Sequence, residues 1–219
     1  MRRRKADLVV WQAASWCLSY PDEDLLARLP MITRALADHR RLEPFQPLLT
    51  RLAERPLTEL QPWHVREFDM SRRHALHLTY WTDGDTRRRG TSLTRIKQAY
   101  RDSGLLVDTH GELPDHLPMV LEFAAVGDPK RGRQLLIEFR PSLELLRMAC
   151  ERDDLPHAGV VRAVCDTLPG QAPRDRSEAL ALINHGPQVE TVGLEPYGAG
   201  LPPGDPRLLP QHLTPASGG

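Results

Sequence analysis

Histidine pairs are the residues of this chain whose type and spacing come closest to a metal site. His74 and His77 are three residues apart, so a helix would place both imidazoles on one face. A zinc site needs three or four protein ligands, and no third ligand follows at a convincing spacing. His110 and His116 have the same shortage. The sequence therefore favours a structural or surface role for these histidines.

Other catalytic and ion-binding motifs are incomplete. The string Asp83-Gly84-Asp85 begins like a calcium loop, but the closing Glu is missing and three arginines occupy its middle. A nucleophile elbow needs a second glycine and a preceding strand, and the segment 90–92 has neither. No P-loop and no dinucleotide fingerprint can be written anywhere. The chain is therefore expected not to be an enzyme, with a helical metal-dependent hydrolase using Asp115, His116 or His110 as an alternative.

The densest internal run of charge is Arg87-Arg88-Arg89. At the start of a helix this run opposes the helix dipole, which favours acids there. It is read either as a contact for an anion or an acidic partner, or as a solvated face. A nucleic-acid-binding regulator using the same helix is a further alternative. Lys plus Arg and Asp plus Glu are both 29, so the net charge is zero, which disfavours nucleic acid as a partner.

The elements that must position these residues are predicted to be helices. The chain has 34 Leu against 15 Ile plus Val, a ratio that favours helix over strand. Apolar residues recur at steps of three and four, with kinks or breaks expected at Pro30 and Pro141. The predicted helical segments are 9–20, 25–36, 65–80, 93–100, 117–125, 136–150, 161–168 and 179–183.

A single all-α helical bundle is predicted for residues 1–185, followed by a disordered tail at 186–219. Those last 34 positions contain 7 Pro and 7 Gly and almost no apolar periodicity, so they cannot offset their ordering entropy. Three cysteines without metal-clip or redox spacing fit a reducing cytoplasm. No signal peptide or membrane span is predicted, and we expect a cytoplasmic protein with no stable membrane association.

Three segments together carry a specific family signal. They are Phe68-Asp69 with Arg72-Arg73, the string 78–90 (LTYWTDGDTRRRG), and the string 112–118 (ELPDHLP) running into 121–123. This combination closely resembles the NarJ family, the cytoplasmic assembly chaperones of respiratory nitrate reductase. That family belongs to the all-helical redox-enzyme maturation proteins, with TorD and DmsD. The resemblance covers about residues 8–185, and the Leu113-Pro114 spacing fits the nitrate reductase branch best.

The resemblance implies a client-binding protein. Family members bind the N-terminal segment of the catalytic (alpha) subunit of nitrate reductase and hold it until membrane docking. They assist insertion of the bis-molybdopterin guanine dinucleotide cofactor into that client and keep no cofactor themselves. Proteins of molybdenum cofactor biosynthesis are further candidate partners. The family motif, here Glu112, Pro114, Asp115 and His116, lies beside the peptide groove.

An apolar groove with a polar rim is what recognition of an amphipathic peptide requires. We expect Leu76, Tyr80 and Trp81 to form one wall, and Leu117 and Leu121 the other. Asp115 and His116 are expected in the first turn of the helix that follows. There Asp115 is either a client contact or a plain helix cap, and His116 either a titratable client contact or a packing histidine.

Overall fold

The structure, a computed structural model, describes residues 2–70, 72–84, 86–105 and 111–184, and all regular secondary structure in these ranges is helical. The predicted tail 186–219 and His110 lie outside the described residues. The α-helices are α1 (Arg2–Leu18), α2 (Glu23–Asp38), α3 (Gln46–Glu54), α4 (Leu57–His64), α5 (Leu78–Asp83), α6 (Arg87–Asp102), α7 (Leu117–Glu122), α8 (Pro129–Glu138), α9 (Arg140–Arg152), α10 (Ala158–Cys165) and α11 (Arg176–Asn184).

Four shorter turns connect or extend these helices. They are the 3₁₀ turns η1 (Glu43–Phe45) and η3 (Arg72–His74), and the π-helical turns η2 (Val65–Asp69) and η4 (Phe123–Gly127). The all-helical fold class predicted from the sequence is confirmed. No described helix is both long enough and apolar enough to cross a bilayer.

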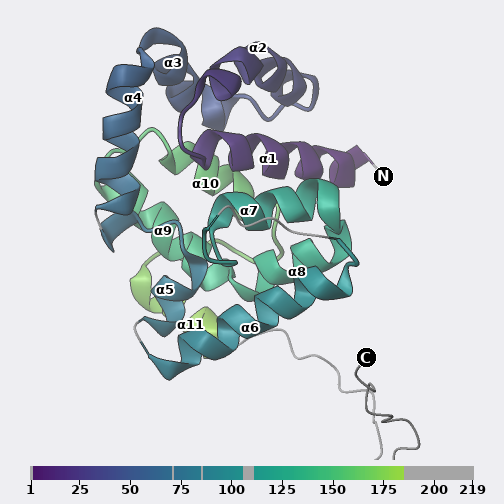
Figure 1. Ribbon diagram of the computed structural model, residues 1–219. Helices are drawn as coiled ribbons and strands as arrows, with labels where there is room; N and C mark the ends of the chain where they lie inside the picture. The colour runs from purple at the N-terminus through teal and green to yellow at the C-terminus, as the bar shows by residue number, and fades with distance from the viewer. Residues whose placement is uncertain (1, 71, 85, 106–110, 185–219) are drawn as a thin grey trace, which may run out of the picture. The chain divides into compact units, whose positions relative to one another are not determined.

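The core forms where α1 crosses α7 and α10 and where α9 packs against α5, α10 and α11 (Figure 1). On α1 the buried face includes Trp11, Ala13 and Cys17. The predicted helix 9–20 extends too far, because α1 ends at Leu18 and Tyr20 is 49% exposed beyond it. Burial of apolar side chains from well-separated segments is what stabilises the bundle.

The two internal prolines behave differently. Pro30 is exposed, and α2 continues past it without a break. Pro141 falls in the first turn of α9, where its missing N–H costs nothing because that turn has no intrahelical acceptor. The predicted helix 136–150 is therefore two helices, α8 and α9, separated at Phe139.

The prediction of one helix over 65–80 is wrong. The chain makes η2 and η3 and then extends through residues 75–77 before α5 begins. The reason is tertiary, because the backbone of this stretch pairs with residues 115–117 instead of with itself. Leu117 N–H donates to the Leu76 carbonyl at 2.8 Å, and Leu78 N–H donates to the Asp115 carbonyl at 3.1 Å. These long-range bonds override the local helical pattern.

Close helix packing near the motif depends on one glycine. A Cβ built on Gly132 of α8 would lie 2.3 Å from the Ala124 Cα, so only glycine allows this approach of α8 to η4. Ala124 lies in η4, which directly follows α7. The close contact with Gly132 therefore fixes the C-terminal end of α7.

Candidate functional site

Two motif strings that are far apart in the sequence meet at a small antiparallel bridge. His77 pairs with His116 across this bridge, and their rings lie 5.4 Å apart between centroids. The bridge ties the segment before α5 to the segment before α7. The family strings are therefore parts of one site, although 38 residues separate His77 from Asp115.

Asp115 is the buried centre of this site. Its side chain is fully buried and accepts hydrogen bonds from Thr79 N–H at 3.0 Å and from the Thr79 hydroxyl at 2.5 Å. His77 Nδ1 lies 3.3 Å from its other oxygen. Burial alone would raise the pKa of Asp115, but these hydrogen bonds from His77 and Thr79 together lower it. The carboxylate therefore fixes the start of α5.

The expectation that Asp115 and His116 lie in the first turn of a helix is wrong. α7 begins at Leu117, and His116 occupies the capping position without a side-chain hydrogen bond to the helix. The Asp115 carboxylate is directed across the bridge to Thr79 instead of along its own helix. Burial lowers the pKa of His116 to about 4, with Glu112 acting in the opposite direction. At neutral pH this imidazole is uncharged.

Above this buried centre lies a group of surface residues that we call the acidic face: Asp69, Met70, His77, Glu112 and Leu113. The carboxylate of Glu112 lies 3.9 Å from His77 Nε2 and is 52% exposed. Burial, and next to it the charge of Glu112, raises the pKa of Asp69. Two large exposed apolar residues are the chain neighbours of these acids: Met70, next to Asp69, is 81% exposed, and Leu113, next to Glu112, is 41% exposed. The face thus combines acids with exposed apolar surface.

Several residues predicted to line an open groove lie in the core instead. Leu76 is 4% exposed, and Leu117 and Leu121 are fully buried. Apolar residues at helical spacing pack inward, which removes them from any surface that a peptide could reach in this conformation. Pro114 is also buried, and its carbonyl accepts a hydrogen bond from the Tyr100 hydroxyl at 2.8 Å.

Tyr80 and Trp81 line a separate open pocket of about 630 Å³, between η3, α5, α9 and α11. The Trp81 indole N–H donates to the Ala75 carbonyl at 2.9 Å, which fixes the ring. Leu145 and Met148 of α9 supply more of the apolar lining. Four arginines also line it, and we call the site the arginine pocket: Arg72, Arg73, Arg152 and Arg176.

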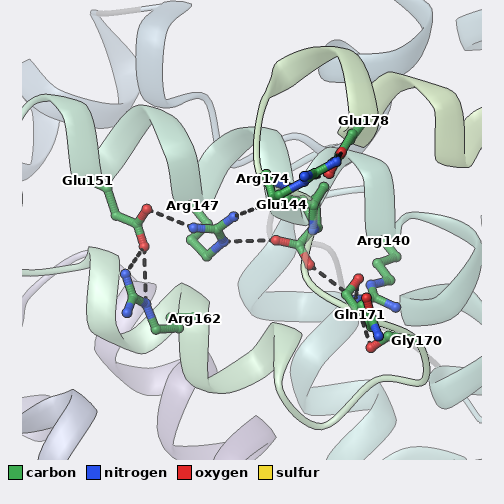
Figure 2. A network of polar contacts seen from close by, with 10 residues as sticks. Arg140, Glu144, Arg147, Glu151, Arg162, Gly170, Gln171, Arg174 and Glu178 are labelled. Atoms are coloured by element: carbon green, nitrogen blue, oxygen red, sulfur yellow. Dashed lines mark hydrogen bonds and ion pairs between the residues drawn. The ribbon is translucent and has the colours of Figure 1, made fainter.

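The helix α9, which lines one side of this pocket, also carries a buried polar network (Figure 2). Glu144, fully buried, lies 3.4 Å from Arg140 Nη2 and 2.8 Å from Arg147 Nε. Arg147 also contacts Glu151 at 2.7 Å. The two buried arginines donate to backbone carbonyls of residues 169–173, the strap that leads into α11. Arg140 Nε is buried without a hydrogen-bond partner, but the bonds that both arginines donate to residues 169–173 tie the strap before α11 to α9.

The arginine run does not form one uniform surface. Arg87 and Arg88 are exposed on the first turn of α6, whereas Arg89 Nε donates to the Thr79 hydroxyl at 3.2 Å. Arg89 therefore extends the hydrogen-bonded chain that runs from Asp115 through Thr79. The prediction of an anion or acidic-partner contact at this run stays a prediction for Arg87 and Arg88.

His74 and His77 face different carboxylates, whereas two ligands of one metal ion would face a common point. His74 Nε2 lies 2.9 Å from Asp153, while His77 faces Asp115 and Glu112. Within the ranges that the structure describes, no group of three His, Cys, Asp or Glu side chains is placed to hold a metal ion. The alternative of a metal-dependent hydrolase gains no support from the described part of the chain.

Sequence reasoning missed Asp69, Arg152 and Arg176 as site residues. Asp69 belongs to a family string, but no local pattern relates it to Glu112. Arg152 and Arg176 come from helix ends that only the fold brings to Trp81. No spacing rule joins residues so far apart in the sequence.

Comparisons with known proteins place the chain in a family. Residues 33–159 match the family model described as nitrate reductase delta subunit. NarX of Mycobacterium tuberculosis, a nitrate reductase-like protein, is 39% identical over 171 residues, which is 73% of this chain and 24% of NarX. This chain thus spans about a quarter of that relative.

Two further similar proteins are matched over most of their own length. The probable nitrate reductase molybdenum cofactor assembly chaperone NarJ of Bacillus subtilis is 28% identical over 173 residues, 78% of this chain and 94% of that protein. The crystal structure of a proposed redox enzyme maturation protein from Archaeoglobus fulgidus superposes with a TM-score of 0.55, at 24% identity, over 76% of this chain and 92% of that one. The second likeness bears on the fold alone. Because the family model covers more than half of the sequence, the chain belongs to the nitrate reductase delta subunit family, in agreement with the NarJ resemblance of its motifs.

Proposed function

We propose that this chain is an assembly chaperone for a respiratory nitrate reductase and not an enzyme. It binds the N-terminal segment of the catalytic subunit and assists insertion of the molybdenum cofactor, in its bis-molybdopterin guanine dinucleotide form, before membrane docking. Its family membership and the names of its NarJ relatives support this role. All three cysteines are free thiols, which suits a reducing cytoplasm. Proteins that synthesise the cofactor are its further proposed partners.

The acidic face is the observation on which the client site rests. Glu112 belongs to the family motif and lies 3.9 Å from His77 Nε2, next to the bridge, and its charge contributes to the raised pKa of Asp69 from the first motif string. Exposed Met70 and Leu113 add apolar surface beside the acids. A segment that carries both basic and apolar side chains complements such a face, as peptide recognition commonly requires. We therefore propose this face as the docking surface for the client.

The buried part of the motif has a different task in this proposal. Asp115 makes its contacts with Thr79 and His77, and no part of its side chain reaches solvent. Its role is to hold the two motif strings together, so that Glu112 and His77 keep their positions on the acidic face. Asp115, which the hydrolase alternative would use for catalysis, thus acts as a positioning residue in this proposal.

Titration calorimetry of the full chain with a synthetic N-terminal peptide of the cognate catalytic subunit tests the docking surface. We expect micromolar or tighter binding, weakened roughly tenfold by Glu112→Gln and by Leu113→Ser, or about 1.4 kcal/mol each. Glu59→Gln on α4 is the matched control, because Glu59 is similarly exposed and lies outside the acidic face. No binding, or equal weakening by the control, would contradict the proposed site.

A further inference from the structure

The arginine pocket has the chemistry of a site for a small anionic ligand, and the client proposal does not use it. Its volume of about 630 Å³ falls in the range of small-molecule sites. The lining residues that the structure describes include four arginines and no carboxylate. Arg152 is paired with Asp153, through contacts of 2.9 and 3.2 Å, and its side chain is still 64% exposed.

The arginines come from three elements that converge on one opening. Arg72 and Arg73 belong to η3, Arg152 ends α9 and Arg176 begins α11. Guanidinium groups bind phosphate oxygens with two parallel hydrogen bonds, which makes arginine the preferred residue for phosphate recognition. Arginines on three sides can therefore contact different oxygens of one phosphate or diphosphate group.

The other part of the lining is apolar and contains a fixed aromatic surface. Trp81 is held by its hydrogen bond to Ala75, and the Tyr80 ring stands edge-on to it with centroids 6.1 Å apart. Leu145 and Met148 face this pair from α9. A flat heteroaromatic ring can stack on tryptophan, whereas an inorganic ion gains no stacking contact from that surface.

Two walls of the pocket, α9 and α11, are joined by the buried polar network. The Glu144 network ties α9 to the strap 169–173 and so to the start of α11, where Arg176 lies (Figure 2). Preorganised walls reduce the ordering that binding would otherwise require.

We infer that the arginine pocket binds a ligand in which a phosphate or diphosphate group is joined to a flat heteroaromatic ring, of the size of a nucleoside diphosphate. The phosphates contact the arginines, and the ring lies against Trp81 and Tyr80. This inference does not depend on the proposed client site, because the two sites share no residue.

Titration calorimetry with guanosine diphosphate and adenosine diphosphate, inorganic pyrophosphate, and the matching nucleosides tests the inference. At least one nucleoside diphosphate should bind about tenfold more tightly than pyrophosphate and far more tightly than its nucleoside. Arg176→Gln and Arg152→Gln should each weaken it about tenfold. Arg174→Gln is the matched control, because Arg174 is 87% exposed and lies outside the pocket lining.

A second variant separates the ring contact from the charge. Trp81→Leu should weaken the nucleoside diphosphate but leave pyrophosphate binding unchanged, and the arginine variants, which alter exposed side chains, control for loss of folding. Absence of binding at millimolar concentrations would overturn the inference. Equal affinity for pyrophosphate and nucleoside diphosphate, or equal weakening by Arg174→Gln, would overturn it too, since each would indicate nonspecific attraction of anions.

Discussion

Removal of the Asp115 carboxylate tests how the motif is built. In Asp115→Ala, the buried Thr79 loses the acceptor of both its N–H and its hydroxyl, at 3.0 and 2.5 Å, and His77 loses a contact at 3.3 Å. A hydrogen bond to a charged group contributes about 1.5–3 kcal/mol, and a buried donor without an acceptor costs about 1–3 kcal/mol. Because these effects overlap, the expected loss is about 3–5 kcal/mol.

A helix cap would behave differently and provides the control. Asp22 is a true cap, since its side chain accepts from Leu25 N–H at 2.7 Å at the start of α2. Loss of such a cap costs about 1 kcal/mol. Asp22→Ala and Asp115→Ala therefore remove the same carboxylate from two kinds of site, one local and one that joins distant segments.

Urea unfolding at pH 7, followed by circular dichroism, measures both losses. Asp115→Ala should lower the free energy of unfolding at least twice as much as Asp22→Ala. Thr79→Val should lower it by about 1.5–3 kcal/mol, and the double variant with Asp115→Ala should lose less than the sum, because both changes remove one shared bond. A loss for Asp115→Ala no larger than that for Asp22→Ala would refute the reasoning.

Four further results are expected. Gly132→Ala should destabilise the fold by about 1–3 kcal/mol or more through its backbone clash. Gly90→Ala, in a helix with open space around it, should stabilise by about 0.5–1 kcal/mol, and urea midpoints compare the two. Burial lowers the pKa of His64 to about 4 and of His157 to about 3. The unfolded chain therefore binds more protons below pH 6.5, so stability should fall by about 1.4 kcal/mol per group for each pH unit down to pH 4. Unfolding free energies that are flat over this window would contradict it. Burial raises the pKa of the Cys17 thiol to about 12, so a thiol reagent should modify it only upon unfolding, and rapid native reaction would show the thiol is accessible.

Local patterns account for the parts of the fold that form independently of distant contacts. The stripes predict helices over 25–36, 93–100 and 117–125, and these segments overlap α2, α6 and α7. The segment 65–80 shows the limit of such patterns, because its backbone bonds to residues 115–117 and not to itself. Neither stripe nor propensity contains information on a partner so distant in the chain.

The family strings mark these residues as a set but do not show which of them are buried. Glu112 is half exposed, whereas Leu117 and Leu121 lie in the core and Asp115 is buried. A sequence string shows which residues belong together, and only the fold determines which of them meet solvent. Trp81 and Arg176 show the same limit of sequence patterns, because only the packing of α5 and α11 against α9 places them in one pocket.

The most direct test of the proposed role is the molybdenum content of the client enzyme. The cognate nitrate reductase subunits are produced in a bacterial host that lacks its own such chaperone, with this chain, without it, and with the Glu112→Gln variant. The purified reductase should contain a full complement of molybdenum only when the intact chain is present, and the variant should give an intermediate value. Equal molybdenum content with and without the chain would contradict the account.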